Sequence, residues 1–321
     1  MQKLFVILGP TAVGKTEISL ALAEEIGAEI ISADSMQVYR GMDIGTAKPT
    51  PAERARVPHH LIDVAEPWEE FSAGRYVSLA DEAIANIKRR GKIPLVVGGT
   101  GMYVRALLEG IFDGPGADFK LREGLAETES GEPGTLHNML KKIDSRAAER
   151  IHPSDTRRII RALEVFEKTG KTISESQRQW RGEGSEGGRY DYKIAGLTRP
   201  RTELYRRIDE RVEKMMKNGL LEEVWALRKN GCARGLPSMQ ALGYKQLMAH
   251  LDGGGLSTGG GEPGLEEAVR LIKRDTRRYA KRQYTWFNAQ KNMAWINVSQ
   301  EKFADSLASV KKALDISDNF R

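Results

Sequence analysis

The most informative motif of the sequence is Gly9-Pro10-Thr11-Ala12-Val13-Gly14-Lys15-Thr16. It matches G-x-x-x-x-G-K-[S/T], the pattern of the phosphate-binding loop (P-loop), whose backbone N–H groups surround phosphate oxygens. An apolar run precedes it at Leu4 to Leu8, and apolar residues at helical spacing follow it as far as Ile26. Because strand, loop and helix are expected in this order, the loop should bind an anion at the N-terminus of the helix.

The segments after the P-loop alternate between strand and helix patterns. Short strands are predicted at Glu29–Ser32 and His60–Val64, and a buried strand at Ile93–Val97. Between them, residues 72–90 have the spacing of an amphipathic helix that ends in basic residues and Gly91. This alternation predicts an α/β fold, a parallel sheet of the P-loop NTPase type flanked by helices.

The strand pattern stops after Gly114 and returns near Lys193. The intervening residues 115–188 have helical patterns, including a helix whose N-cap is expected at Asp155. We therefore predict an inserted all-helical domain at 115–188 within a discontinuous core of residues 1–114 and 189–321. In the second part of the core, strands are expected at Lys193–Leu197 and Ala294–Val298, and helices from Pro200, Ser238 and Leu265.

Charge is distributed unevenly along the 321 residues, although the net charge is only +6. Residues 1–110 carry 12 basic and 14 acidic side chains, and residues 111–321 carry 38 and 30. A basic surface added to a neutral enzyme core would produce this asymmetry and would suit a polyanion. An ordinary solvated surface is the alternative that charge alone leaves open.

The single cysteine, Cys232, excludes an intrachain disulfide or a cysteine metal cluster. The apolar run near the N-terminus ends at Gly9-Pro10, too early for a signal-peptide core, and no window is long enough for a membrane span. We therefore expect a cytoplasmic protein that has no contact with a membrane.

The P-loop predicts binding of a di- or triphosphate but does not identify the molecule that carries it. A kinase or ATPase is the default hypothesis. Lys15 is expected to reach terminal phosphate oxygens, and the Thr16 hydroxyl to bind Mg²⁺. Asp34 follows the second predicted strand and should lie at the carboxyl edge of the sheet, where ligands bind. There it can serve as a Mg²⁺ ligand or as a general base.

Several motifs resemble those of the tRNA dimethylallyltransferases, also called tRNA isopentenyltransferases. They cover much of the chain between residues 4 and 290 and have the family's order. Besides the P-loop, the matching blocks are Asp34–Pro49, Pro58–Asp63, Val97–Tyr103, Arg161–Val165, Gln240–Lys245 and Thr276–Gln283. The combination is far more specific than the P-loop alone.

The resemblance implies transfer of a dimethylallyl group from dimethylallyl diphosphate to N6 of adenosine 37, beside the anticodon of tRNA, with Mg²⁺ as cofactor. It implies that Asp34 is the general base, that Thr100 contacts the target nucleotide, and that Arg211 joins the P-loop in binding diphosphate. It further implies tRNA contacts by Asp34, Ser35, Met36, Gln37, Thr100, Arg122, Arg157, Arg158, Ile159, Ile160, Arg161, Gln240, Ala241, Leu242, Gly243, Tyr244 and Lys245. The family is generally monomeric, and we expect the same here.

The segment from Arg270 to Arg282 contains seven basic residues and one acid, Asp275. On a helix these residues form a wide basic face, from which we expect Arg277 and Arg278 to contact the RNA backbone. A purely solvated face is the alternative. Two other functions also stay open at this point: a P-loop small-molecule kinase whose lid is the insertion, with ATP in the loop, and a nucleotide-switched RNA-binding protein without catalysis.

Overall fold

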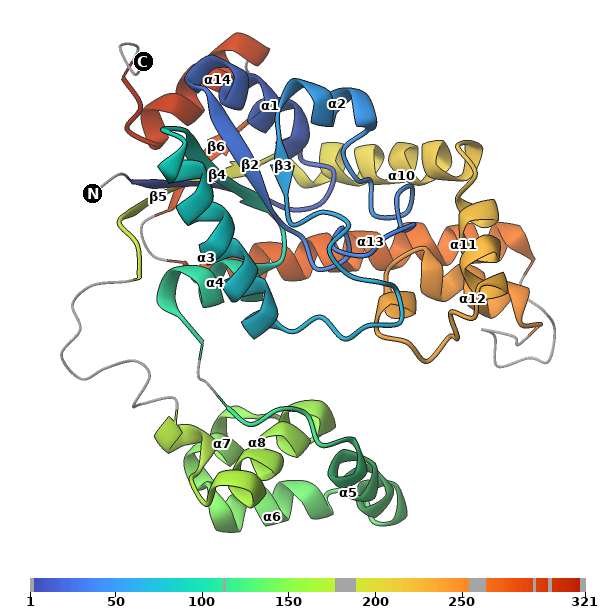
Figure 1. Ribbon diagram of the computed structural model, residues 1–321. Coiled ribbons are helices and arrows are strands. Elements are labelled where there is room, and N and C mark those ends of the chain that lie inside the picture. The colour runs from blue at the N-terminus through green and yellow to red at the C-terminus, as the bar shows by residue number, and fades with distance from the viewer. Residues whose placement is uncertain are drawn as a thin grey trace. The chain divides into compact units, whose positions relative to one another are not determined.

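In the computed structural model, six parallel strands form one sheet in the order β3-β2-β4-β1-β5-β6 (Figure 1). The structure describes residues 3–111, 114–176, 189–253, 264–290, 293–299 and 302–317. The central strands are short apolar runs buried on both faces, as parallel sheets require. The strands are β1 (Leu4–Leu8), β2 (Ala28–Ala33), β3 (His59–His60), β4 (Ile93–Gly98), β5 (Tyr192–Thr198) and β6 (Met293–Asn297).

Helices cover both faces of this sheet, which confirms the predicted α/β class. One face packs against α1 (Lys15–Ile26), α10 (Arg201–Lys217) and α14 (Phe303–Ala313), and the other against α3 (Ala73–Arg89) and α4 (Gly101–Glu109). The long helix α13 (Leu265–Asn288) contributes Ala280 to the first core and Phe287 to the second. It thereby connects the two sides near the P-loop.

A third core lies beside the sheet and supports the segment after β2. It is formed by α11 (Leu220–Lys229), α12 (Tyr244–Leu251), parts of α10 and α13, and the loop that leads to α2 (Pro51–Arg56). The predicted start of the helix at Ser238 was wrong, because residues Ser238–Gln240 form only a 3₁₀ turn. Ala241 is extended and Gly243 has a φ of +92°, so the α-helix begins only at Tyr244.

The third predicted strand is much shorter than His60–Val64. Pairing with β2 ends at His60, because Leu61 and Asp63 both have left-handed backbones, with φ values of 62° and 58°. The residues that follow instead form a loop that supplies Asp63 to an ion-pair cluster described below.

The described residues between Glu109 and Arg189 form a compact helical unit, separate from the unit that contains the sheet. Its helices α5 (Phe119–Gly131), α6 (Thr135–Ile143), α7 (Ser145–Arg150) and α8 (Thr156–Thr169) enclose a small core of their own. The Asp155 side chain accepts from the Arg158 N–H at 3.2 Å, which confirms the predicted N-cap. The predicted C-terminal boundary, Gly188, lies outside the described residues. No helix in the described ranges is long and apolar enough to cross a membrane.

Candidate active site

The P-loop is held by side chains that are distant in the sequence. Arg207 Nε donates to the Ala12 carbonyl at 2.9 Å, and Arg199 Nε donates to the Val13 carbonyl at 2.8 Å. Two residues of the loop have left-handed backbones, Ala12 with φ 64° and Gly14 with φ 108°. The first N–H groups of α1, from Lys15 onward, have no acceptor within the helix and can receive an anion.

Gln283 of α13 ties the P-loop to the end of β4. Its Oε1 accepts from the Thr11 N–H at 2.9 Å, and its Nε2 donates to the Gly99 carbonyl at 2.9 Å. A Cβ at position 99 would lie 2.5 Å from Gln283 Nε2, so any larger residue there would displace this amide from its hydrogen bonds. The side chain therefore fixes the distance between the two loops that border the site.

Lys15 and Arg211 provide the positive charge beside the loop. Lys15 Nζ donates to the Gly9 and Pro10 carbonyls at 2.8 and 2.9 Å. Burial, and secondly the neighbouring Arg211 charge, lower the pKa of Lys15, whereas Asp34 raises it; together they bring the pKa to about 7. Burial also lowers the pKa of Arg211, although a guanidinium stays charged at neutral pH.

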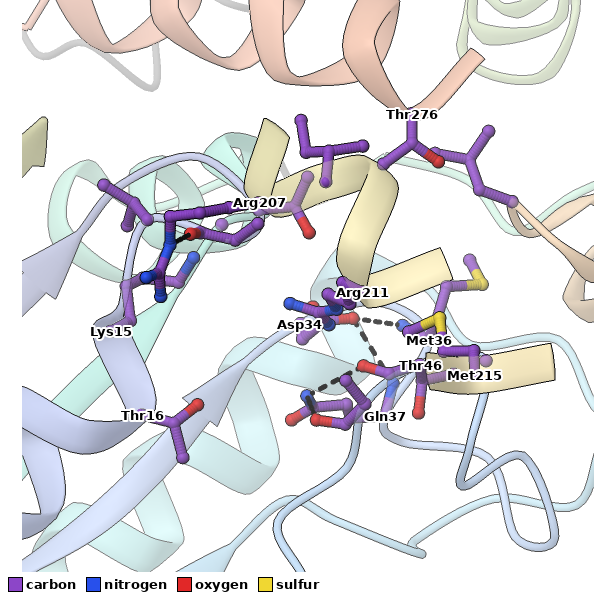
Figure 2. Close-up of a pocket in the computed structure, with 18 of the residues that line it drawn as sticks. Lys15, Thr16, Asp34, Met36, Gln37, Thr46, Arg207, Arg211, Met215 and Thr276 are labelled. Carbon is purple, nitrogen blue, oxygen red and sulfur yellow. Dashed lines mark hydrogen bonds between the residues drawn. The ribbon is translucent and has the colours of Figure 1, made fainter. Parts of the chain in front are cut away.

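A cavity of about 1050 Å³ connects this positive end with Asp34 (Figure 2). Among the predicted residues, those that line it are Thr11 to Thr16, Asp34 to Gln37, Arg211, and Gln240 to Gly243. Apolar side chains, among them Met36, Met215 and Ile272, also line it. The cavity thus combines an anion-binding end, a carboxylate and an apolar wall.

Asp34 follows directly after β2 and caps the turn that it begins. Its Oδ1 accepts from the N–H groups of Met36 and Gln37, at 2.9 and 3.3 Å. Because both bonds are to Oδ1, Oδ2 is the oxygen placed to accept a proton from a ligand. The Thr100 hydroxyl joins this turn by accepting from the Ser35 N–H at 3.0 Å.

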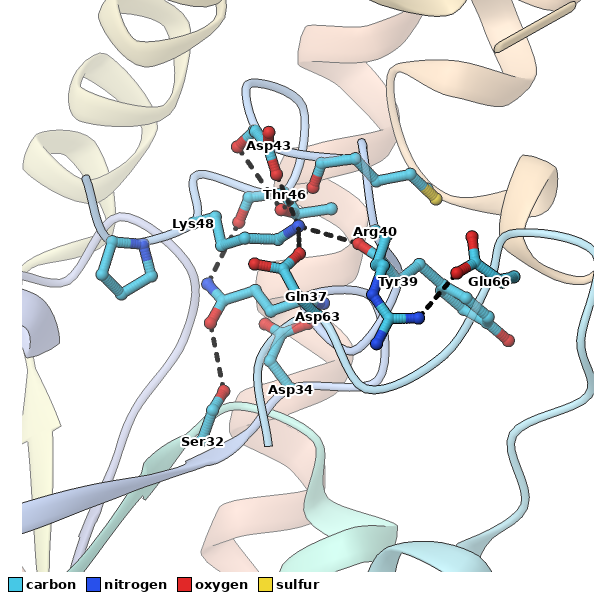
Figure 3. Close-up of polar contacts among 12 residues, drawn as sticks. Ser32, Asp34, Gln37, Tyr39, Arg40, Asp43, Thr46, Lys48, Asp63 and Glu66 are labelled. Atoms are coloured by element: carbon cyan, nitrogen blue, oxygen red, sulfur yellow. Dashed lines mark hydrogen bonds and ion pairs between the residues drawn. The ribbon is translucent and has the colours of Figure 1, made fainter. Parts of the chain in front are cut away.

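The loop after Asp34 is fixed from both ends by polar contacts (Figure 3). Gln37 accepts from the Ser32 hydroxyl at 3.1 Å, and its amide donates to the carbonyls of Thr46 and Ala47 at 3.3 Å. The buried Lys48 Nζ contacts Asp43 at 2.5 Å and Asp63 at 2.6 Å. A buried cation that lost these partners would be costly, so the cluster holds the loop in one conformation.

Glu223 of α11 holds the middle of the same loop. Its carboxylate accepts from the N–H groups of Asp43, Ile44 and Gly45 at 2.8–3.2 Å and from the Tyr244 hydroxyl at 2.6 Å. A Cβ on Gly45 would lie 2.4 Å from the Tyr244 ring. The Gln240–Lys245 block therefore supports the loop that carries Asp34, a role that the sequence pattern did not indicate.

Burial corrects part of the predicted site. Gly9 and Pro10 are buried and are absent from the described residues that line the cavity. Their carbonyl groups instead accept hydrogen bonds from Lys15 Nζ. The side chains of Ala241 and Tyr244 belong to the third core, and that of Ile159 to the core of the insertion. The side chains of Tyr244 and Ile159 are completely buried and cannot contact RNA, whereas Ala241 also lines the cavity.

Arg207, Tyr279, Arg282 and Gln283 are among the lining residues that sequence reasoning did not assign to the site. The sequence shows Arg207 on the same helix face as Arg211 at i,i+4, a spacing that a solvated surface pair would also have. The other three lie in the Thr276–Gln283 block and could have been assigned once α13 was known to pass the P-loop.

In the insertion, the predicted arginines divide into two groups. Arg157 and Arg158 are exposed on α8. Arg122 and Arg161 instead contact Glu164, whose side chain is completely buried. Burial alone would raise the pKa of Glu164, but hydrogen bonds from Arg122, the Asp118 backbone and Arg161 lower it to about 2. Both guanidinium groups stay about one third exposed, at 36% and 34%.

The basic face of α13 is largely paired with acids. Arg277 lies 3.3 Å from Asp209 of α10, and Arg278 lies 3.6 Å from Asp275. Arg270, Lys273 and Arg274 contact Glu267, Glu213 and Asp275. The face is cationic, but its net charge is smaller than the sequence count indicates.

A Mg²⁺ ion would suit this site. Thr16 lines the cavity next to Lys15 and is the residue whose hydroxyl would bind Mg²⁺ in the P-loop motif. The described residues contain no group of three His, Cys, Asp or Glu side chains that could hold a metal ion. A cation here would take most of its ligands from the diphosphate and water, which is the usual coordination of Mg²⁺.

The sheet, the P-loop and the carboxylate at the carboxyl edge of the sheet define a P-loop protein of the α/β class. The IPP transferase family model matches residues 37–290, and the isopentenyl transferase model matches residues 2–63. The chain belongs to the IPP transferase family.

Relatives at full length agree with this assignment. The tRNA dimethylallyltransferase of Thermodesulfovibrio yellowstonii is 49% identical over 303 residues, 93% of this chain and 92% of its own. The structure of the tRNA isopentenylpyrophosphate transferase of Bacillus halodurans is 42% identical, with a TM-score of 0.70, covering 97% of this chain and 95% of that one. A eukaryotic dimethylallyltransferase solved acting on tRNA has a TM-score of 0.79 at 30% identity, covering 98% and 77%.

Proposed function

We propose that this protein transfers a dimethylallyl group from dimethylallyl diphosphate to N6 of adenosine 37 in tRNA, releasing diphosphate. The observation that carries the proposal is the single cavity that joins the P-loop, Lys15 and Arg211 to Asp34 through an apolar wall. A prenyl diphosphate has this sequence of chemistry: an anion, then a hydrocarbon chain that ends at the acceptor. The names of the relatives, which act on tRNA, support the choice of acceptor.

Each polar residue has a defined task in this reaction. The first N–H groups of α1, with Lys15 and Arg211, bind the diphosphate and stabilise the charge that grows as the C1–O bond breaks and its electron pair leaves with oxygen. The N6 lone pair forms the new bond to C1. Asp34 Oδ2 accepts the proton that N6 loses, while Oδ1 stays bound to the Met36 and Gln37 N–H groups.

Mg²⁺ bound at Thr16 would add Lewis-acid stabilisation of the leaving diphosphate. We propose Mg²⁺ dependence on this basis. The same loop can hold the phosphates of ATP, but a prenyl transfer has no need for phosphoryl transfer.

The tRNA must expose its target base before N6 can reach Asp34, since a stacked base cannot enter a pocket. We propose that Ser35, Thr100 and the exposed Gln240 contact the extruded nucleotide. The exposed arginines of the insertion, Arg157 and Arg158, would bind the anticodon stem-loop backbone. We further propose that the protein acts as a monomer in the cytoplasm.

The decisive experiment incubates the protein with Mg²⁺, dimethylallyl diphosphate and unmodified tRNA and analyses the nucleosides by mass spectrometry. We expect N6-(dimethylallyl)adenosine at position 37, and none after chelation of Mg²⁺ or with a tRNA that has guanosine there. ATP hydrolysis coupled to a small acceptor, without prenylated adenosine, would instead favour the kinase alternative.

A further inference from the structure

The apolar part of the cavity wall contains two methionines from different elements. Met215 lies on α10, and Met36 lies in the turn after β2. Both line the cavity and both pack, partly buried, against the third core. In Figure 2 both lie on the side of Asp34 that faces away from Lys15.

Their positions are fixed by the residues that bind the two reacting groups. Met215 follows Arg211 by four residues, so it lies on the same face of α10, about 6 Å further along the helix axis at 1.5 Å per residue. Met36 donates its own N–H to Asp34 Oδ1 at 2.9 Å. Met215 is therefore positioned by the helix that carries Arg211, and Met36 by its hydrogen bond to Asp34.

The transferred carbon C1 must lie between the diphosphate and the acceptor nitrogen, and the rest of the hydrocarbon must lie against the apolar wall. The three C–C bonds from C1 to the terminal methyl groups of a dimethylallyl chain span about 4 Å. A second isoprene unit would roughly double this length. We therefore expect one helical turn beyond Arg211 to accommodate a dimethylallyl chain, and Met215 and Met36 to occupy the space that a second isoprene unit would need.

We propose that Met36 and Met215 form the wall that limits the transferred group to one isoprene unit. The inference rests on the proposed function and deepens it. Unbranched methionine side chains fill irregular space well, and their truncation to alanine removes three heavy atoms each without introducing a polar group. Behind them, the buried Ile272 and Val212 also line the cavity and would form the floor of the enlarged pocket.

The test measures kcat/KM for dimethylallyl diphosphate and geranyl diphosphate with Met215→Ala, Met36→Ala and the double variant, with tRNA at a saturating concentration. We expect the geranyl-to-dimethylallyl ratio to rise at least tenfold in the double variant, because one poorly fitting methylene already changes such a ratio about 10–200-fold. Met216→Ala is the matched control: it lies on the same helix and packs against the same core, but it does not line the cavity.

Non-reacting thiolodiphosphate analogues of both substrates give the same ratio from Kd where turnover is lost. A ratio that stays within about twofold of wild type in the double variant, or that shifts equally in Met216→Ala, overturns the proposal. Absence of dimethylallyl transfer by the wild-type protein would instead overturn the proposed function, so the two failures are distinguishable.

Discussion

The pKa of Lys15 predicts how diphosphate binding depends on pH. The ammonium form binds the anion, and burial has lowered its pKa from 10.5 to about 7 in the free protein. A bound diphosphate would raise the pKa again by placing negative charge beside the ammonium. Binding should therefore be strong below pH 7 and weaken above it, with uptake of a proton.

The magnitude follows from the fraction of the binding-competent form. That fraction is about 0.9 at pH 6, about 0.1 at pH 8 and about 0.01 at pH 9, and the apparent Kd varies as its inverse. We expect Kd for inorganic diphosphate to rise about 10-fold from pH 6 to pH 8 and about 90-fold to pH 9. Proton uptake per bound ligand should be about 0.1 at pH 6 and 0.9 at pH 8.

Isothermal titration calorimetry in buffers of different ionisation enthalpy measures both quantities. Diphosphate itself titrates, so the control is Lys15→Arg, whose side chain stays charged throughout. The difference between the two profiles belongs to Lys15. Equal proton uptake by wild type and Lys15→Arg at pH 8 would refute the assignment of a lowered pKa to this ammonium.

Three further perturbations test other parts of the proposal. Asp34→Asn keeps an acceptor for the turn but removes the base, so kcat should fall about 10²–10⁴-fold while Kd for tRNA stays within about twofold; an equal loss of affinity would contradict the base role. Glu164→Ala should destabilise the insertion by about 2–3 kcal/mol, since it leaves two partly exposed guanidinium groups without their buried partner. Hydrogen exchange in residues 119–169 would detect this, and the wild-type contribution should itself be lost as pH falls from 4.5 towards 2, through the lowered pKa. Charge reversal at Arg277 and Arg278 should weaken tRNA binding and reduce its salt slope by about 1–2, and an unchanged slope would mean that these residues only face solvent.

The parts of the site that are local in sequence were predictable. The P-loop is a single segment whose strand and helix are its immediate neighbours, and Asp34 follows its strand directly. The Asp155 N-cap is likewise formed by residues three positions apart. Such features depend on backbone geometry that a short pattern determines.

Contacts between distant segments could not be predicted in this way. Gln283 meets Thr11 across 272 positions and Arg207 meets Ala12 across 195, so both depend on how α13 and α10 cross the sheet. Lys48 is an extreme case, since lysine is almost never buried unless it is paired. Its partner Asp63 lies in a loop where a strand had been expected.

Blocks that match a family combine contact residues with residues that support them, and a pattern does not separate the two. Within Gln240–Lys245, Gln240 and Lys245 are exposed, whereas Tyr244 is completely buried and bonds to Glu223. Ile159 is equally buried next to the exposed Arg158. Helical periodicity alone would have placed Ile159 inside, because Ile159 and Leu163 share the apolar face of α8 at i,i+4.

The sequence count of basic residues on α13 likewise does not separate cations that are free to contact RNA from those that are paired with acids. Its paired cations face acids on α10 and α13 itself, and most of these pairs are partly exposed, so each stabilises the fold by about 0–1 kcal/mol. An RNA phosphate can therefore displace the acid at little cost. A cation that is already paired releases fewer counterions when RNA binds, so the salt slope should be smaller than seven independent phosphate contacts would give. We therefore expect the basic residues of this helix to contribute more to positioning the RNA than to the salt-dependent part of its affinity.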